Sequence, residues 1–186
     1  MGVDRSFIIQ PSDFGIVLMV ILGIDPGLNA TGYGVIDADG GRWRLISAGD
    51  LRPPRARPLA ERLAFLHEGL TTLIRRTHPN TAVLEMVFTH QKYQATAALM
   101  AHARGVACLA VQEHGLTMAE YPPARIKQAL TGHGAASKAQ VARMVEQWLG
   151  GGDPSWSADA TDALALALAH AHMASQRRRL PAGAVK

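Results

Sequence analysis

Residues 16–36 read Ile16-Val-Leu-Met-Val-Ile-Leu-Gly-Ile-Asp-Pro-Gly-Leu-Asn-Ala-Thr-Gly-Tyr-Gly-Val-Ile36. The first part, Ile16–Ile24, is a nearly continuous apolar run rich in β-branched residues, which is the pattern of a strand buried on both faces. Asp25-Pro26 interrupts this run, and Gly32–Ile36 predicts a second strand. The stretch is therefore typical of an α/β protein, in which helices cover both faces of a sheet.

The rest of the chain extends this sheet and supplies its helices. Asp37-Ala-Asp-Gly-Gly41 is a strong hairpin signal, and it leads to a third strand over Trp43–Ala48. The further elements that we expect are an amphipathic helix over about 58–76, a strand over Thr81–Phe88, an alanine-rich helix over about 93–113, a strand over Leu116–Tyr121 that Pro122-Pro123 ends, a helix that opens with a capping-box pattern at Ser137–Gln140, and a last helix from near Ser157 to about Ser175. This order has no internal repeat and no long linker, so it predicts one mixed α/β domain.

The composition is that of a globular protein with ample material for a core. The chain has 186 residues, of which 48% are hydrophobic and 18% charged, so wholesale disorder is excluded. Its longest apolar run, over 14–24, is shorter than the ~20 residues of a spanning helix and lacks the flanks of a secretory signal. Cys108 is the only cysteine, which excludes an intramolecular disulfide and fits a cytoplasmic protein. The net charge of +4 leans weakly toward a polyanionic partner.

Four carboxylates lie in apolar stretches of the sequence, and no single structural role accounts for all of them. Asp25 ends the most apolar strand, and Glu85 interrupts another apolar strand. Asp159 and Asp162 lie three residues apart near the start of an Ala/Leu-rich helix, so they share one helix face. Taken singly, each has an ordinary role, such as a turn residue at Asp25 or a helix N-terminal acid at Asp159. Together they indicate a shared site, because buried carboxylates need pairing or a cation.

Clustered carboxylate oxygens are the ligands that Mg²⁺ and Mn²⁺ prefer. Two such ions held close together activate a water molecule and stabilise the leaving oxygen when a phosphodiester bond is cut. The four acids Asp25, Glu85, Asp159 and Asp162 therefore favour a metal-dependent reaction on a phosphate ester.

Short motifs around these acids follow one another in a fixed order. They are Gly23-Ile-Asp-Pro-Gly27, Thr31-Gly-Tyr-Gly34, Leu84-Glu-Met-Val-Phe88, Ala103-Arg-Gly-Val106, Ile126-Lys-Gln128, Ser137-Lys-Ala-Gln-Val141 and Ala158-Asp-Ala-Thr-Asp-Ala-Leu164. As a set, from about residue 17 to about residue 174, they closely resemble the RuvC Holliday-junction resolvases. Met86 departs from the family pattern, in which many members have glutamine, but neither residue is a metal ligand.

The resemblance implies a ribonuclease-H-like fold, a five-stranded mixed sheet flanked by helices, assembled as a homodimer. It implies paired, symmetric nicks in four-way junction DNA during recombination and repair, in cooperation with the RuvA–RuvB branch-migration complex. Asp25, Glu85, Asp159 and Asp162 would be both catalytic and metal-binding, with two Mg²⁺ ions per site that Mn²⁺ can replace. We expect the nuclease domain to cover 16–175, with an N-terminal extension over 1–15 and a basic tail over 176–186.

The expected DNA contacts come from basic and aromatic residues near these acids. Lys127 and Lys138 match basic positions that the family uses beside its active-site groove, and phosphate contacts supply most of the affinity for DNA. Phe88 follows the catalytic strand and could stack on an unpaired base at the junction centre. Arg104 is a further candidate, with a packing or pairing role inside the protein as its alternative.

Three other functions compete with the junction resolvase. A phosphotransferase of the actin and sugar-kinase class also carries the Asp-x-Gly and Thr-Gly pattern, but it encloses its nucleotide between two such domains. A RuvC-like nuclease acting on structured RNA, similar to the YqgF proteins, would use related motifs. A non-catalytic junction-binding module would gain nothing from four carboxylates facing phosphates. The complete motif set favours the resolvase.

Overall fold

The structure is a computed structural model, and it describes residues 19–39, 41–86, 94–153 and 155–179. Its elements are β1 (Met19–Asp25), β2 (Thr31–Asp39), β3 (Arg42–Leu51), α1 (Leu59–Thr77), β4 (Thr81–Glu85), α2 (Gln94–Glu113), β5 (Thr117–Tyr121), α3 (Pro123–Thr131), α4 (Lys138–Trp148) and α5 (Ala158–Arg179). The predicted extension over 1–15 and the residues after 179 lie outside this description, so the division into domain, extension and tail stays a prediction.

The five strands form one mixed sheet in the order β3-β2-β1-β4-β5. β1, β2 and β3 are antiparallel neighbours, whereas β4 and β5 run parallel to β1. This confirms the predicted five-stranded mixed sheet and its α/β class. Because β1 and β4 are parallel and Ile24 is the partner of Leu84, the two strands end side by side, at Asp25 and Glu85.

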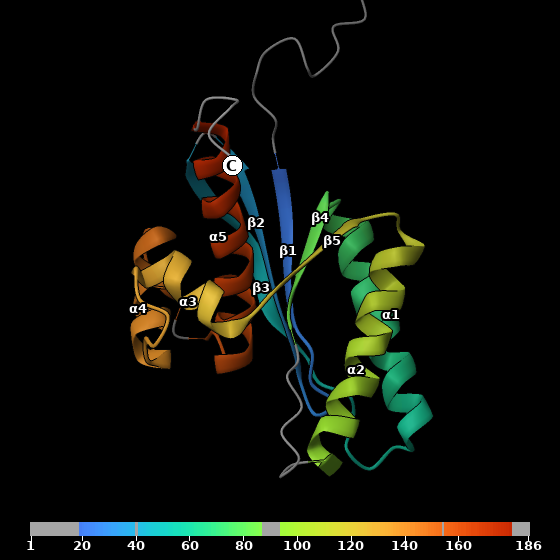
Figure 1. Ribbon diagram of the computed structural model, residues 1–186. Helices are drawn as coiled ribbons and strands as arrows, with labels where there is room; N and C mark the ends of the chain where they lie inside the picture. Colours follow the sequence, from blue (N-terminus) through green and yellow to red (C-terminus); the bar gives the residue numbers. More distant parts are fainter. Residues whose placement is uncertain (1–18, 40, 87–93, 154, 180–186) are drawn as a thin grey trace, which may run out of the picture.

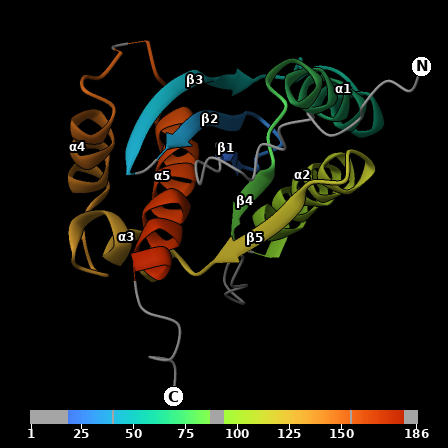
Figure 2. The same ribbon diagram turned by 90° about the horizontal axis from the view of Figure 1, so that it is seen from above.

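Helices cover both faces of this sheet (Figure 1). α1 and α2 lie on one face, and α3, α4 and α5 lie on the other, with α5 directly against the strands (Figure 2). Alternate residues of β1 therefore enter two different cores: Ile21 packs in the core with α5, and Leu22 packs in the core with α1 and α2. Among the described residues, no helix is long and apolar enough to cross a bilayer.

Several of the expected elements differ from the structure. The helix α3 was missed, because Pro122-Pro123 was interpreted only as the end of a strand. Pro123 is in fact the first residue of α3, a position where its missing N–H costs nothing. The strand expected over 81–88 ends at Glu85, and the last helix continues past Ser175 to Arg179.

Candidate active site

The first two acids lie where neighbouring parallel strands end. Leu84 packs in the core with α1 and α2, and side chains alternate along a strand, so Glu85 points to the face that carries α5. The same alternation after Ile24 directs Asp25 to that face. Two carboxylates from distant parts of the sequence thus meet on one face at one end of the sheet.

The other two acids reach this place because α5 lies unusually close to the sheet. Glycines of β1 and β2 make the approach possible. A Cβ added at Gly23 would overlap with the carbonyl oxygen of Ala163, and a Cβ added at Gly32 would overlap with the backbone of Asp159. Backbone contacts backbone at both points, so α5 can neither approach further nor accept a larger residue below it. The motif glycines therefore set the position of the acids on α5.

The first turn of α5 is fixed by a capping serine. Ser157 Oγ accepts a hydrogen bond from the Ala160 amide at 3.0 Å and donates one to Asp50 Oδ1 at 2.6 Å. Asp50 belongs to β3, so the start of the helix is tied to the sheet. Asp159 and Asp162 follow directly, on one helix face, and both are half-buried.

The four carboxylates act on one another electrostatically. Burial, followed by the charges of Asp162, Asp159 and Glu85, raises the pKa of Asp25 to about 7, against the weaker opposing effect of Lys138. Burial and the charge of Asp162 also raise the pKa of Glu85. Mutual repulsion of this kind marks a group of like charges in one partly dehydrated place, which is typical of functional sites.

Two lysines face this negative group. Lys138, the first residue of α4, donates a hydrogen bond from Nζ to Asp162 Oδ2 at 2.6 Å, although its side chain is 80% exposed. This pairing raises the pKa of Lys138. Lys127, on α3, lowers the pKa of Glu85 through its charge. Helix α3, which was not predicted from the sequence, therefore positions Lys127, one of the predicted DNA contacts, beside the acidic group.

The donor set has the chemistry of a site for hard divalent cations, since it consists of carboxylate oxygens with incompletely neutralised charge. Over the ranges that the structure describes, however, no three His, Cys, Asp or Glu side chains are gathered closely enough to hold a metal ion between them. An ion bound by Asp162 would compete with Lys138 for its carboxylate.

Two predicted DNA contacts remain, Arg104 and Phe88. Arg104 is bonded inside the protein. Arg104 donates from Nη1 to the carbonyl oxygen of Glu85 at 2.7 Å and also pairs with Glu120, so its 18%-exposed side chain holds the end of β4. Its alternative role, pairing within the protein, is the one that this geometry favours. Phe88 lies outside the described residues. Sequence reasoning missed the Arg104–Glu85 contact because a carbonyl partner leaves no trace in residue types.

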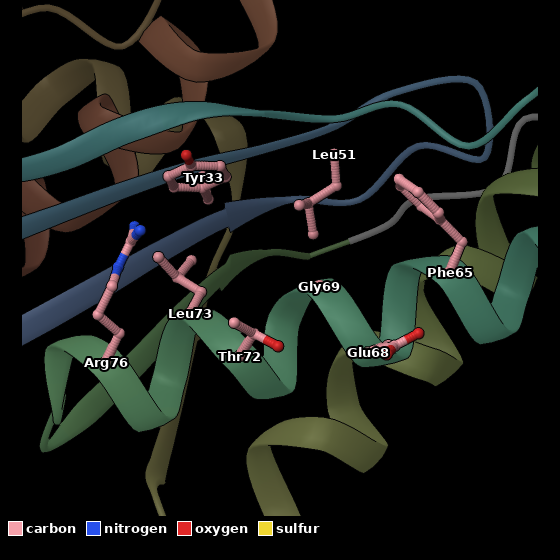
Figure 3. A pocket seen from close by; sticks show the side chains of 8 residues that line it. All are labelled: Tyr33, Leu51, Phe65, Glu68, Gly69, Thr72, Leu73 and Arg76. Carbon is pink, nitrogen blue, oxygen red and sulfur yellow. The ribbon is translucent and has the colours of Figure 1, made fainter.

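Two cavities lie away from the acids. One, of about 360 Å³, lies between α1 and the strands β2 and β3, and Figure 3 shows Tyr33, Leu51 and Phe65 among its lining residues. The other, of about 490 Å³, lies beside Trp148 and His172. None of the four acids lines either of these two cavities.

Comparisons with known proteins identify the family of this chain. The sequence model of the family described as crossover junction endodeoxyribonuclease RuvC matches residues 21–170. The RuvC of Halorhodospira halophila is 51% identical over 152 residues, covering 82% of this chain and 89% of that protein. That of Rhodopseudomonas palustris is 44% identical over 162 residues, covering 87% and 92%.

Solved structures of junction resolvases are also similar to this chain in three dimensions. Thermus thermophilus RuvC in complex with a Holliday junction substrate superimposes with a TM-score of 0.79 at 32% identity, covering 86% of this chain and 96% of that one. The yeast mitochondrial Holliday junction resolvase Ydc2, with a TM-score of 0.63 at 11% identity over 87% and 82% of the two chains, shares the fold. By the family model, the sequence identities and the structural match, this chain belongs to the RuvC family of crossover junction endodeoxyribonucleases.

Proposed function

We propose that Asp25, Glu85, Asp159 and Asp162 are the catalytic acids with which this crossover junction endodeoxyribonuclease resolves four-way DNA junctions. The observation that carries the proposal is the electrostatic coupling of the four carboxylates, three of which raise the pKa of Asp25 although they come from β4 and α5. A structural role does not require such a group, because four mutually repelling charges cost stability.

Members of this family depend on a metal ion. Two Mg²⁺ ions, which Mn²⁺ can replace, would be held by the four carboxylates and would supply an activated water and stabilisation of the leaving oxygen. The chain itself contributes the ligand charges and their placement. Asp25 must lose its proton to act as a ligand, and its raised pKa makes that loss less favourable in the metal-free protein. The products would carry 5′-phosphate and 3′-hydroxyl ends.

Lys127 and Lys138 are placed to bind the phosphates that flank the cut. Each stands at the rim of the acidic group, on α3 and at the start of α4. Lys138 can exchange Asp162 for a phosphate when a metal ion binds Asp162, because the lysine side chain is exposed and its attraction to the carboxylate is weak in water. The stacking of Phe88 on an open base stays part of the proposal.

A homodimer would bring two such sites to the two halves of one junction. The outward side of α2 offers a surface for the second copy. Ala98, His102, Gly105 and Leu109 follow at spacings of three and four, and all are exposed. Leu109 is 51% exposed, and nothing lies within 4 Å of the place where Gly105 would carry a Cβ. A second α2 could therefore approach closely and cover Leu109. Cooperation with a RuvA–RuvB complex and a cytoplasmic location complete the proposal.

Cleavage of a mobile four-way DNA junction tests the proposal, with Mg²⁺ and with Mn²⁺, beside a linear duplex of the same sequence and a structured RNA. We expect paired nicks at symmetric positions on the junction, and none on the duplex. Preferential cleavage of the RNA would instead identify a YqgF-like nuclease. Junction binding without cleavage in either metal would identify a non-catalytic binding module.

A further inference from the structure

A tyrosine stands beside Glu85 on the neighbouring strand. Tyr121, the last residue of β5, is the register partner of Glu85, and its carbonyl oxygen accepts a hydrogen bond from the Met86 amide at 2.8 Å. In-register residues of adjacent strands point to the same face of a sheet. The Tyr121 side chain therefore follows that of Glu85 to the α5 face, where it packs against the core.

This tyrosine is bonded to the helix that carries the other acid pair. The Tyr121 hydroxyl lies 2.9 Å from Nδ1 of His170, and the two rings are 5.8 Å apart between centroids. Burial, and then the charge of Arg177, lowers the pKa of His170, which favours the neutral imidazole; in its Nε2–H tautomer, Nδ1 accepts a hydrogen bond from the Tyr121 hydroxyl. His170 lies eight residues after Asp162, which is about 12 Å along the helix.

The contact adds a directional restraint on one side of α5. Towards β1 and β2, steric contact at Gly23 and Gly32 limits how close the helix can come. Towards β3, the hydrogen bond from Ser157 to Asp50 ties the start of the helix to the sheet. Towards β4, Val83 and leucines of α5 such as Leu164 belong to one apolar cluster. Apolar contacts are non-directional, so on this side of the helix the contact between Tyr121 and His170 supplies the directional restraint.

We propose that Tyr121 and His170 are positioning residues, which together set the spacing between the strand that carries Glu85 and the helix that carries Asp159 and Asp162. The inference rests on the proposed function, since it assigns a role to the pair within that same site. Outer partners of this kind matter because ligand groups must be held within a fraction of an ångström, and their loss typically costs about 10- to 100-fold in metal affinity or activity.

Four variants separate positioning from ordinary stabilisation. Tyr121→Phe removes only the hydroxyl, and His170→Leu removes the acceptor. His170→Asn keeps an acceptor close to the position of Nδ1. His67→Leu is the matched control, because His67 also makes a side-chain contact, 2.7 Å to Glu113, but joins α1 to α2 on the other face of the sheet.

Three quantities are measured on each variant and on the wild type. They are the single-turnover rate of junction cleavage, the Kd for the junction in EDTA, and the affinity of the DNA-free protein for Mn²⁺ by calorimetry. We expect Tyr121→Phe and His170→Leu each to lower the cleavage rate and the Mn²⁺ affinity about 10-fold, with the junction Kd unchanged. The double variant should be no worse than either one, because both remove the same bond. His170→Asn and His67→Leu should match the wild type.

A Tyr121→Phe variant with the wild-type cleavage rate and Mn²⁺ affinity would overturn the inference. So would equal losses in His170→Asn and His170→Leu, which indicate a general packing role. If the wild type cuts no junction yet its Mn²⁺ affinity depends on the pair, the proposed function fails and the positioning role stands. A wild-type protein that neither cuts junctions nor binds Mn²⁺ would overturn both.

Discussion

The helices α2 and α5 are both rich in alanine and lie on opposite faces of the same sheet, yet their surroundings differ sharply. Every residue of α5 from Ala163 to Ala169 is buried, because the strands beneath it carry glycine and other structure closes around it. α2 buries only one side, including Ala107 and Ala110, and leaves Leu109 outward. The amino-acid composition of a helix therefore does not decide its role. Helix α5 is packed tightly where it carries two of the acids, whereas α2 leaves one face exposed.

A glycine-to-alanine substitution beneath α5, compared with one in α2, gives the strongest test of this difference in packing. Gly23→Ala inserts a methyl group into the backbone of α5 and must displace the helix. We expect it to lower the free energy of unfolding by about 3 kcal/mol and the cleavage rate about 100-fold. Gly105→Ala meets open space in α2, so its free energy of unfolding should stay within about 1 kcal/mol of the wild type. Urea denaturation and a cleavage assay measure both, and equal losses would contradict the account.

The electrostatic cost of the acid group should appear as a pH dependence of stability. The pKa of Asp25 is raised to about 7 in the folded protein, so this residue favours folding at low pH, and its contribution is lost as the pH rises from about 4 through 7. In EDTA, Asp25→Asn should therefore be more stable than the wild type at pH 8, by about 2 kcal/mol, and no more stable at pH 4. Thermal or urea unfolding across this range measures the effect.

Asp153→Asn is the control for this pH dependence. A backbone hydrogen bond from Ser155 lowers the pKa of the exposed Asp153, so this group stays ionised between pH 5 and 8 and its replacement should leave the wild-type slope unchanged. Parallel curves for the wild type and Asp25→Asn would refute the raised pKa.

On the other face, a charge on α2 should weaken the proposed dimer without harming the fold. Leu109→Glu places a carboxylate at the end of the exposed row formed by Ala98, His102, Gly105 and Leu109, and we expect the dimer dissociation constant to rise at least about 10-fold while thermal stability of the monomer changes little. Leu45→Glu, on the exposed part of β3, should leave the association unchanged. Sedimentation of both variants decides, and an unaffected dimer in Leu109→Glu would remove α2 from the interface.

The smallest expected effect concerns a single phosphate contact at the rim of the acids. Lys127→Met should weaken junction binding a few-fold and reduce the slope of log affinity against log salt concentration by about 1. Lys127→Arg, which keeps the charge, should retain the wild-type slope. Binding titrations at several salt concentrations in EDTA measure it, and an unchanged slope in Lys127→Met would show that this lysine does not touch the backbone.

Much of this arrangement could be predicted from the sequence because it depends on local pattern. Asp25 and Glu85 were conspicuous as charges in apolar strands, and the i, i+3 spacing of Asp159 and Asp162 placed them on one face. The capping box at Ser137 is present as expected. Such features need only the periodicity of a strand or helix.

The features that were missed depend on tertiary neighbours or on residues with two meanings. Pro123 can end a strand or begin a helix, and the spacing of Ile126 and Leu130 was the available sign of α3. The contact of His170 with Tyr121 was not foreseen either, since its partner on β5 is 49 positions away. The contact of Arg104 with the carbonyl oxygen of Glu85 was missed as well, because a backbone partner cannot be inferred from residue types.

The central claim is that Asp25 acts in one catalytic group with Glu85 and the two acids of α5. Its most direct test is single-turnover cleavage of a four-way junction by Asp25→Asn in Mg²⁺ and in Mn²⁺, with the junction Kd measured in EDTA on the same preparation. The account predicts a Kd equal to that of the wild type and no detectable cleavage in either metal. Cleavage at a rate close to that of the wild type would contradict it.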